Sequence, residues 1–134
     1  MNTCTEPAIS IAALETGDID PQLFDHEAHV YAGWLYLREF PLAEAIARFT
    51  AALQRLTARL GVPEKYHETV SWFFLLLIAE RRALSATDGW SDFRSNNDDL
   101  FRRNNNVLAR YYSDELVGSD LARRRFLLPD RLAS

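Results

Sequence analysis

The chain contains three histidines, and their spacing is compatible with one shared chemical site. His26 and His29 lie in the stretch F-D-H-E-A-H, and His67 lies in K-Y-H-E-T. A helix places residues three or four positions apart on the same face. On helices, each histidine would therefore head an otherwise apolar face. Imidazole nitrogens bind transition metals and also transfer protons near neutral pH.

Two histidines from one helix and a third from another have the ligand set of a three-nitrogen metal site. Helical bundles build such sites from the side chains of facing helices. Zinc, iron, copper or nickel accept imidazole ligands, and three protein ligands leave positions open for water or substrate. We therefore predict a transition-metal site at His26, His29 and His67. A dinuclear carboxylate site needs two Glu-x-x-His pairs, and only Glu64 and His67 form one.

Neighbouring polar residues are candidates for supporting and catalytic roles. Asp25 precedes His29 by four residues and is expected to hold one of its ring nitrogens. Tyr66 and Glu68 flank His67, and these three residues are the catalytic candidates. On a helix Glu68 is rotated by about 100° from His67, so it would ligate a metal directly only if the helix were distorted.

Small and aromatic residues on the same faces predict a pocket beside the histidines. Gly33 lies on the face of His26, and a glycine inside a helix costs about 1 kcal/mol relative to alanine. The space it leaves should therefore serve a neighbouring helix or a ligand. Ser71 and Phe74 share the face of His67, and Trp34 belongs either to the core or to the pocket. Small-molecule pockets are mostly apolar with a few placed polar groups.

The pattern of apolar residues predicts an all-α, single-domain helical bundle. Asp20 and Pro21 form a typical helix start, Pro41 opens the next helix, and Gly61 ends it. Short helices are expected after Ser113 and Ser119. The four main helical regions cover about residues 21–39, 41–60, 64–84 and 92–110, the last interrupted at 95–99. Residues 1–19 are expected to form a loose N-terminal arm, and residues 20–134 the helical domain.

Composition excludes several classes of protein. The 134 residues suffice for one domain with a core, and a net charge of −4 argues against a nucleic-acid surface. The single Cys4 cannot build a disulfide framework. The longest apolar run, residues 72–79, is too short to span a membrane. No basic residue precedes Arg38, so we expect a cytoplasmic protein without a secretory signal.

Four stretches together resemble a group of short bacterial proteins of uncharacterised function. They are F-D-H-E-A-H-V-x-x-G-W-L-Y-L, K-Y-H-E-T, Y-Y-S-D-E-L and A-R-R-R-F-L-L-P-D, and the likeness runs from Phe24 to Asp130. K-Y-H-E-T is the most distinctive of them. The resemblance implies a helical bacterial domain and adds no chemistry.

Three functional hypotheses follow from the sequence. The first is an enzyme that transforms a small molecule with a metal ion that polarises substrate or activates water or dioxygen; lyase, hydrolase and oxygenase are not distinguished. The second is a metal-free small-molecule-binding protein or acid/base catalyst that uses the same histidine pocket. The third is a non-catalytic protein-interaction module in which the histidines only satisfy buried contacts. A small-molecule substrate is the expected partner, without nucleic acid or membrane, and a homodimer is left open.

Overall fold

Helices form all of the regular structure in the described part of the chain, which comprises residues 6–86, 88–102 and 107–131. The structure is a computed structural model. The elements are α1 (Ile11–Thr16), η1 (Pro21–Leu23), α2 (His26–Glu39), α3 (Leu42–Arg59), η2 (Pro63–Lys65), α4 (Glu68–Ala83), α5 (Trp90–Asn96), η3 (Asp98–Phe101), α6 (Leu108–Tyr111), α7 (Asp114–Val117) and α8 (Asp120–Arg124), where η denotes a 3₁₀ turn. They share one hydrophobic core, which confirms the predicted all-α domain. None of the described helices is long and apolar enough to cross a membrane.

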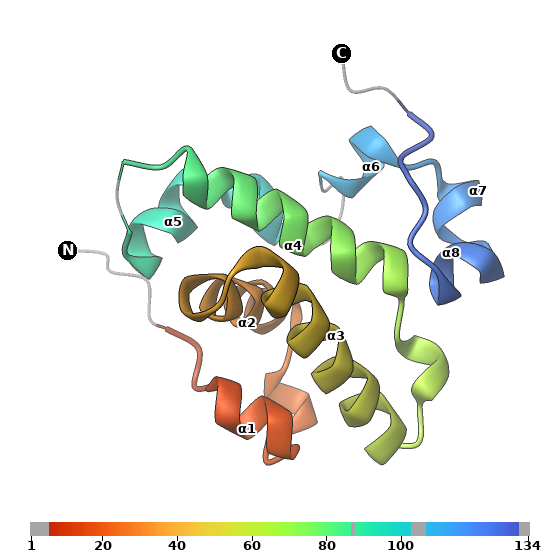
Figure 1. Cartoon of the computed structure of the whole chain (residues 1–134), viewed down its shortest axis with the longest axis horizontal. Coiled ribbons are helices and arrows are strands. Elements are labelled where there is room, and N and C mark those ends of the chain that lie inside the picture. The colour runs from red at the N-terminus through yellow and green to blue at the C-terminus, as the bar shows by residue number, and fades with distance from the viewer. Residues whose placement is uncertain (1–5, 87, 103–106, 132–134) are drawn as a thin grey trace.

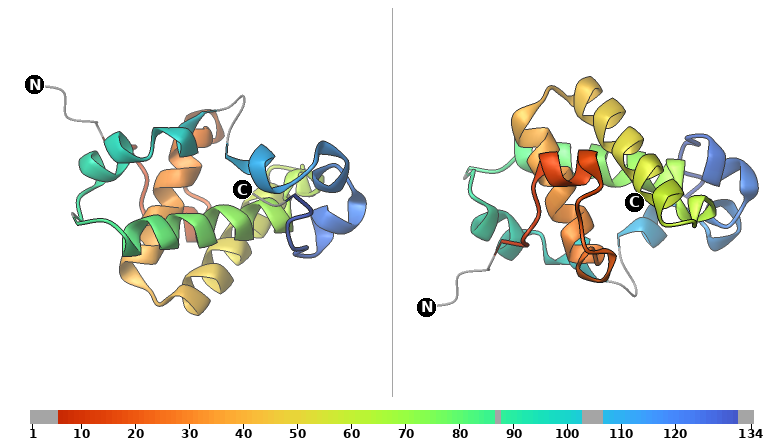
Figure 2. Two further views of the ribbon diagram at one scale, coloured as in Figure 1. Left: turned by 90° about the horizontal axis from the view of Figure 1, so that it is seen from above. Right: turned by 90° about the horizontal axis from the view of Figure 1, so that it is seen from below.

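Helix α4 runs through the middle of the molecule, as its almost uniformly apolar sequence predicts (Figure 1). It packs against α2 and α3, and the buried side chains of Leu75 and Ile78 contribute to the core between them. Helix α5 lies near the end of α4, and α6, α7 and α8 gather near its beginning (Figure 2). The three longest helices, α2, α3 and α4, therefore lie side by side around the core.

Helix α2 begins five residues later than the sequence predicts. Asp20 does accept a hydrogen bond from the Gln22 N–H, and proline follows it, but this start produces only the single turn η1. Phe24 then leaves the helical conformation, and the Asp25 side chain accepts from the Ala28 N–H at 2.9 Å. This second N-cap starts α2 at His26.

The start of α4 also differs, and the difference changes the role of His67. The sequence predicts a helix from about residue 64, but residues 63–65 form the separate turn η2. Tyr66 and His67 are extended, and α4 begins at Glu68 with His67 as its N-cap. By contrast, α3 has the predicted bounds: it follows Pro41 and ends before Gly61, whose φ of +74° favours glycine.

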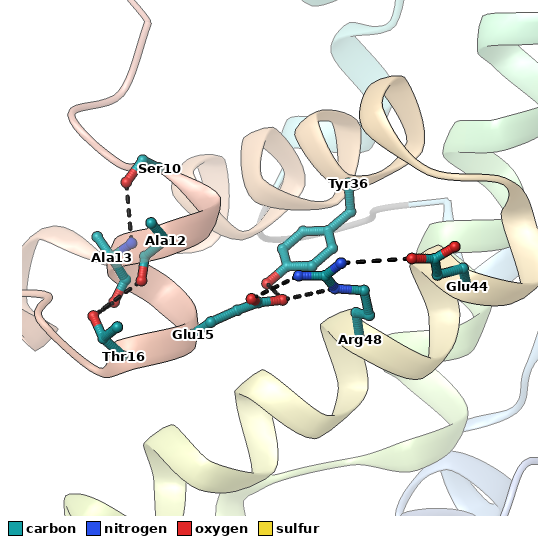
Figure 3. Close-up of polar contacts among 8 residues, drawn as sticks. All are labelled: Ser10, Ala12, Ala13, Glu15, Thr16, Tyr36, Glu44 and Arg48. Carbon is teal, nitrogen blue, oxygen red and sulfur yellow. Dashed lines mark hydrogen bonds and ion pairs between the residues drawn. The ribbon is translucent and has the colours of Figure 1, made fainter.

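The N-terminal segment, for which the sequence predicts a loose arm with at most a short turn around residues 9–15, contains helix α1 at Ile11–Thr16. Ser10 caps α1, and Leu14 is only 1% exposed in the core. The Arg48 guanidinium of α3 donates to both carboxylate oxygens of Glu15 at 2.9 and 3.0 Å, and the Tyr36 hydroxyl donates at 3.2 Å (Figure 3). The hydrogen bonds from Arg48 hold the pKa of Glu15 below its usual value. These contacts fasten α1 to α2 and α3.

The C-terminal third follows the predicted pattern of short helices. The break expected near residue 97 separates α5 from η3, and the stretch 103–106 of the predicted fourth helical region lies outside the described residues. Ser113 and Ser119 cap α7 and α8 by accepting from the backbone N–H groups three residues on, as predicted. The Asp130 carboxylate holds the Ser113 backbone N–H and hydroxyl at 2.8 and 2.6 Å.

Candidate functional site

A cavity of about 450 Å³ lies between α2, α3 and α4. Its walls are mostly apolar, with Phe49 and Leu53 from α3 and Phe74 from α4. The polar side chains that line it are Asp25, His26, His29 and Ser71. The cavity therefore combines apolar walls with a small group of polar side chains near the start of α2.

His26 is held by a hydrogen bond across the molecule. Its Nε2 lies 2.8 Å from the Leu100 carbonyl oxygen of η3. A carbonyl only accepts, so Nε2 carries the hydrogen and donates it. The ring also meets Phe74 edge-on, with centroids 5.6 Å apart. Within the described chain, Nδ1 of His26 has no hydrogen-bond partner, and in the neutral ring this nitrogen is an acceptor.

His29 is held in the same way by its own helix. Its Nδ1 donates to the Asp25 carbonyl oxygen at 2.9 Å, and its ring stacks on Phe24 with centroids 3.9 Å apart. His29 is exposed at the surface of the cavity, yet desolvation by the neighbouring protein atoms lowers its pKa. No hydrogen bond to Nε2 is found among the described residues, so the neutral ring keeps a lone pair there.

His67 uses both of its ring nitrogens for structure. Its Nδ1 accepts from the Val70 N–H at 3.1 Å and so caps α4. Its Nε2 donates to the Val117 carbonyl oxygen of α7 at 2.7 Å. His67 does not line the cavity, because it precedes α4 instead of lying on the face of Ser71 and Phe74.

The geometry does not support His67 as the third ligand of a metal site. In residues 6–86, 88–102 and 107–131, no three His, Cys, Asp or Glu side chains are grouped so that they could hold a metal ion. His26 and His29 are the two imidazoles with an unbonded nitrogen in the described structure. The expected contact between Asp25 and His29 exists, but it uses the backbone carbonyl of Asp25 instead of its carboxylate.

The other catalytic candidates bind each other. The Tyr66 hydroxyl donates a short hydrogen bond to the Glu68 carboxylate. Burial, together with this carboxylate, raises the pKa of Tyr66 above its ordinary value. Neither residue lines the cavity. The pair therefore lies apart from the two histidines of α2.

The predicted pocket residues divide in the structure. Gly33, Ser71 and Phe74 line the cavity, whereas Trp34 is 2% exposed and packs against Tyr31 in the core. A Cβ atom at Gly33 would lie 3.1 Å from Leu75 Cδ2 and 3.2 Å from Ile78 Cδ1. The neighbouring helix α4 therefore uses the space that this glycine leaves.

Thr69 carries a role that the sequence interpretation missed. It is fully buried, and its hydroxyl lies 2.6 Å from the Ala122 carbonyl oxygen and 2.7 Å from that of Arg125. The Thr69 hydroxyl oxygen also accepts a hydrogen bond from the Leu127 N–H at 3.1 Å. Together with His67, Thr69 fastens residues 113–127, which we call the C-terminal segment. In the K-Y-H-E-T stretch, His67 and Thr69 thus hold backbone groups of the C-terminal segment by hydrogen bonds.

The sequence analysis also missed several pocket residues, and the sequence indicates some of them more clearly than others. Phe49 and Leu53 belong to the apolar stripe of α3, so periodicity indicated that they face inward without indicating a cavity. Phe24 precedes the helix and gave no periodic signal. The Leu100 carbonyl that orients His26 is a backbone group and has no signature in the sequence.

The chain matches no protein-family model, no curated protein and no solved structure. The resemblance to short bacterial helical proteins stays a prediction.

Proposed function

We propose that this chain is a small-molecule-binding protein whose ligand occupies the cavity between α2, α3 and α4. One observation carries the proposal: an apolar cavity of about 450 Å³ is lined by two imidazoles that each keep one nitrogen without a hydrogen-bond partner among the described residues. Small-molecule sites typically measure about 300–1,000 Å³ and combine apolar walls with a few polar groups.

The orientation of the two imidazoles supports the proposal. Each ring is fixed by a hydrogen bond to a backbone carbonyl, of Leu100 or Asp25, and by an aromatic neighbour. Groups that are already oriented lose little conformational entropy when a ligand binds. The free nitrogens are therefore suited to fix one polar group of an otherwise apolar ligand.

Acid/base catalysis in the same cavity is a second candidate. Desolvation lowers the pKa of His29, so its imidazole is unprotonated at neutral pH and is able to accept a proton from a bound ligand. This candidate requires that His29→Phe abolish turnover of a bound substrate while its binding is weakened only a few-fold.

The metal-dependent enzyme stays a prediction. A metal site would require a further metal-coordinating group in addition to His26 and His29. Titration with a transition metal, monitored through the NMR signals of the histidines, tests it.

The binding proposal is tested by NMR with a library of small aromatic and aliphatic fragments. Fragments that bind should shift the methyl signals of Leu53, Val70 and Ile78 and leave those of the exposed Leu84 and Leu121 unchanged. The proposal fails if no fragment shifts the three cavity methyl groups at millimolar concentration.

Two matched variants localise the binding. Ser71→Phe places a ring in the cavity and should abolish the shifts, because Ser71 lines the cavity. Leu76→Phe adds the same ring on the exposed face of α4 and should leave binding unchanged. If Ser71→Phe binds fragments as the wild type does, the ligand does not occupy this cavity.

A further inference from the structure

We infer that the cavity selects ligands that donate hydrogen bonds, such as phenols, alcohols and amines, over carboxylates and phosphates. This inference rests on the proposed binding function and names the chemistry of its ligand. It follows from the direction of each hydrogen bond that the lining side chains already make.

In both imidazoles the ring N–H group already donates a hydrogen bond to the protein. Nε2–H of His26 donates to Leu100, and Nδ1–H of His29 donates to Asp25. Neither carbonyl has a hydrogen to give, so these bonds fix the tautomer of each neutral ring. The nitrogen that remains on each ring carries a lone pair and only accepts.

The other polar side chains of the lining are acceptors as well. The Ser71 hydroxyl donates its hydrogen to the His67 carbonyl oxygen at 2.8 Å, so only its lone pairs are left. The Asp25 carboxylate accepts from the Ala28 N–H and has no hydrogen to donate when ionised. Among the described residues that line the cavity there is no Lys, Arg, Asn, Gln, Trp or Tyr.

An anionic ligand would therefore meet no side-chain donor among the described residues that line this cavity. Its carboxylate or phosphate group would lose water without a compensating hydrogen bond from these side chains, and it would lie near the carboxylate of Asp25. A hydroxyl or amino group would instead find the imidazole lone pairs of His26 and His29. The direction of the available hydrogen bonds would therefore discriminate between these two kinds of ligand.

Three ligands of nearly equal shape test the inference: para-cresol, para-xylene and para-toluate. Their dissociation constants are measured from the cavity methyl signals of the full chain at about pH 8, where imidazoles are neutral. We expect para-cresol to bind about two- to tenfold more tightly than para-xylene, which is the usual value of one net hydrogen bond. Para-toluate should bind more weakly than para-xylene, because its charge would be desolvated without a side-chain donor.

The outcomes separate the inference from the proposed function. The inference is overturned if para-toluate binds as tightly as para-xylene, or if para-cresol gains nothing over para-xylene; in both cases the binding function stands. If none of the three shifts the cavity methyl groups while other fragments do, the preference for donors of this kind is also overturned. If no compound of any kind shifts them, the proposed function itself fails.

Histidine variants show whether the imidazoles produce the preference. His29→Phe keeps an aromatic ring against Phe24 and removes the acceptor, so the ratio of para-cresol to para-xylene affinity should fall at least about twofold. His26→Phe is the second variant, and His67→Asn is the control, because His67 lies outside the lining. If the ratio is unchanged in both His29→Phe and His26→Phe, the imidazoles do not select the ligand and the inference is overturned.

Discussion

The start of α2 and the start of α4 both carry histidines in similar sequence settings, yet the two regions use them differently. At α2, His26 and His29 each bond one backbone carbonyl and keep one nitrogen free beside a cavity. At α4, His67 bonds a backbone N–H on one side and a carbonyl on the other. A histidine is thus available for chemistry only when the surrounding backbone leaves one of its nitrogens without a partner.

The comparison also separates binding from stability. The α2 region borders a cavity, so its imidazoles should affect ligand affinity. The α4 region, with His67 and Thr69, fastens the C-terminal segment, so its side chains should affect the free energy of unfolding. Variants of the two regions should therefore change different measurements.

The largest effect is expected at Thr69. Thr69→Val keeps the shape but leaves the carbonyls of Ala122 and Arg125 and the Leu127 N–H without their partner in the interior. We expect the free energy of unfolding in urea to fall by about 2–3 kcal/mol. Thr69→Ser keeps the hydroxyl and should lose clearly less. Equal losses in the two variants would show that the methyl group, and not the hydroxyl, fastens the C-terminal segment.

A smaller loss is expected at His67. His67→Ala removes the N-cap of α4 and the hydrogen bond to Val117, and it should lower the free energy of unfolding by about 1–2 kcal/mol. His67→Asn restores an N-cap and should recover part of the loss. Fragment affinity should stay the same in both variants. If the His67→Ala protein is as stable as the wild type but no longer binds fragments, His67 belongs to the binding site and the difference between the two regions is contradicted.

His29 should show the opposite behaviour. His29→Phe preserves the ring stack on Phe24, and the residue is partly exposed, so the free energy of unfolding should change by no more than about 0.5 kcal/mol. The affinity for para-cresol should fall about two- to tenfold. Urea unfolding and NMR titration on the same samples measure both quantities. A large loss of stability without a change in affinity would show that His29, like His67, has a structural role.

The smallest effect is a dependence of stability on pH. Because desolvation lowers the pKa of His29 below 6.5, the unfolded chain takes up a proton at a higher pH than the folded chain does. The stability that neutral His29 contributes is complete above pH 6.5 and is lost as the pH falls through the lowered folded value. Unfolding measured between about pH 8 and pH 5 should show this decline. His29→Phe should flatten it, and an unchanged slope would contradict desolvation of this ring.

Helix periodicity and capping residues predicted most of the fold. The apolar pattern of α4, the prolines and glycine around α3, and the serines before α7 and α8 all act within a few residues, so the sequence alone reveals them. The late starts of α2 and α4 were missed because a proline turn precedes each helix. In both places a capping residue that follows the turn, Asp25 or His67, begins the helix.

The candidate site was predictable only in part. His26, His29, Gly33, Ser71 and Phe74 were expected near a pocket and line one. The position of His67 was not predictable, because both of its bonds go to backbone groups and one of these lies fifty residues away. Periodicity assigns a face to a side chain inside a helix, and it has no meaning for a residue that lies just before one.

The contact of Arg48 with Glu15 and Tyr36 has a consequence for the beginning of the chain. Helix α1 has only six residues, too few to be stable by itself, so it depends on this partly exposed ion pair and on the burial of Leu14. Dissolved salt screens such a pair, whereas it hardly affects hydrogen bonds to buried carbonyls. Increasing ionic strength should therefore loosen α1 from α3 first and leave the packing of α2, α3 and α4 around the cavity unchanged.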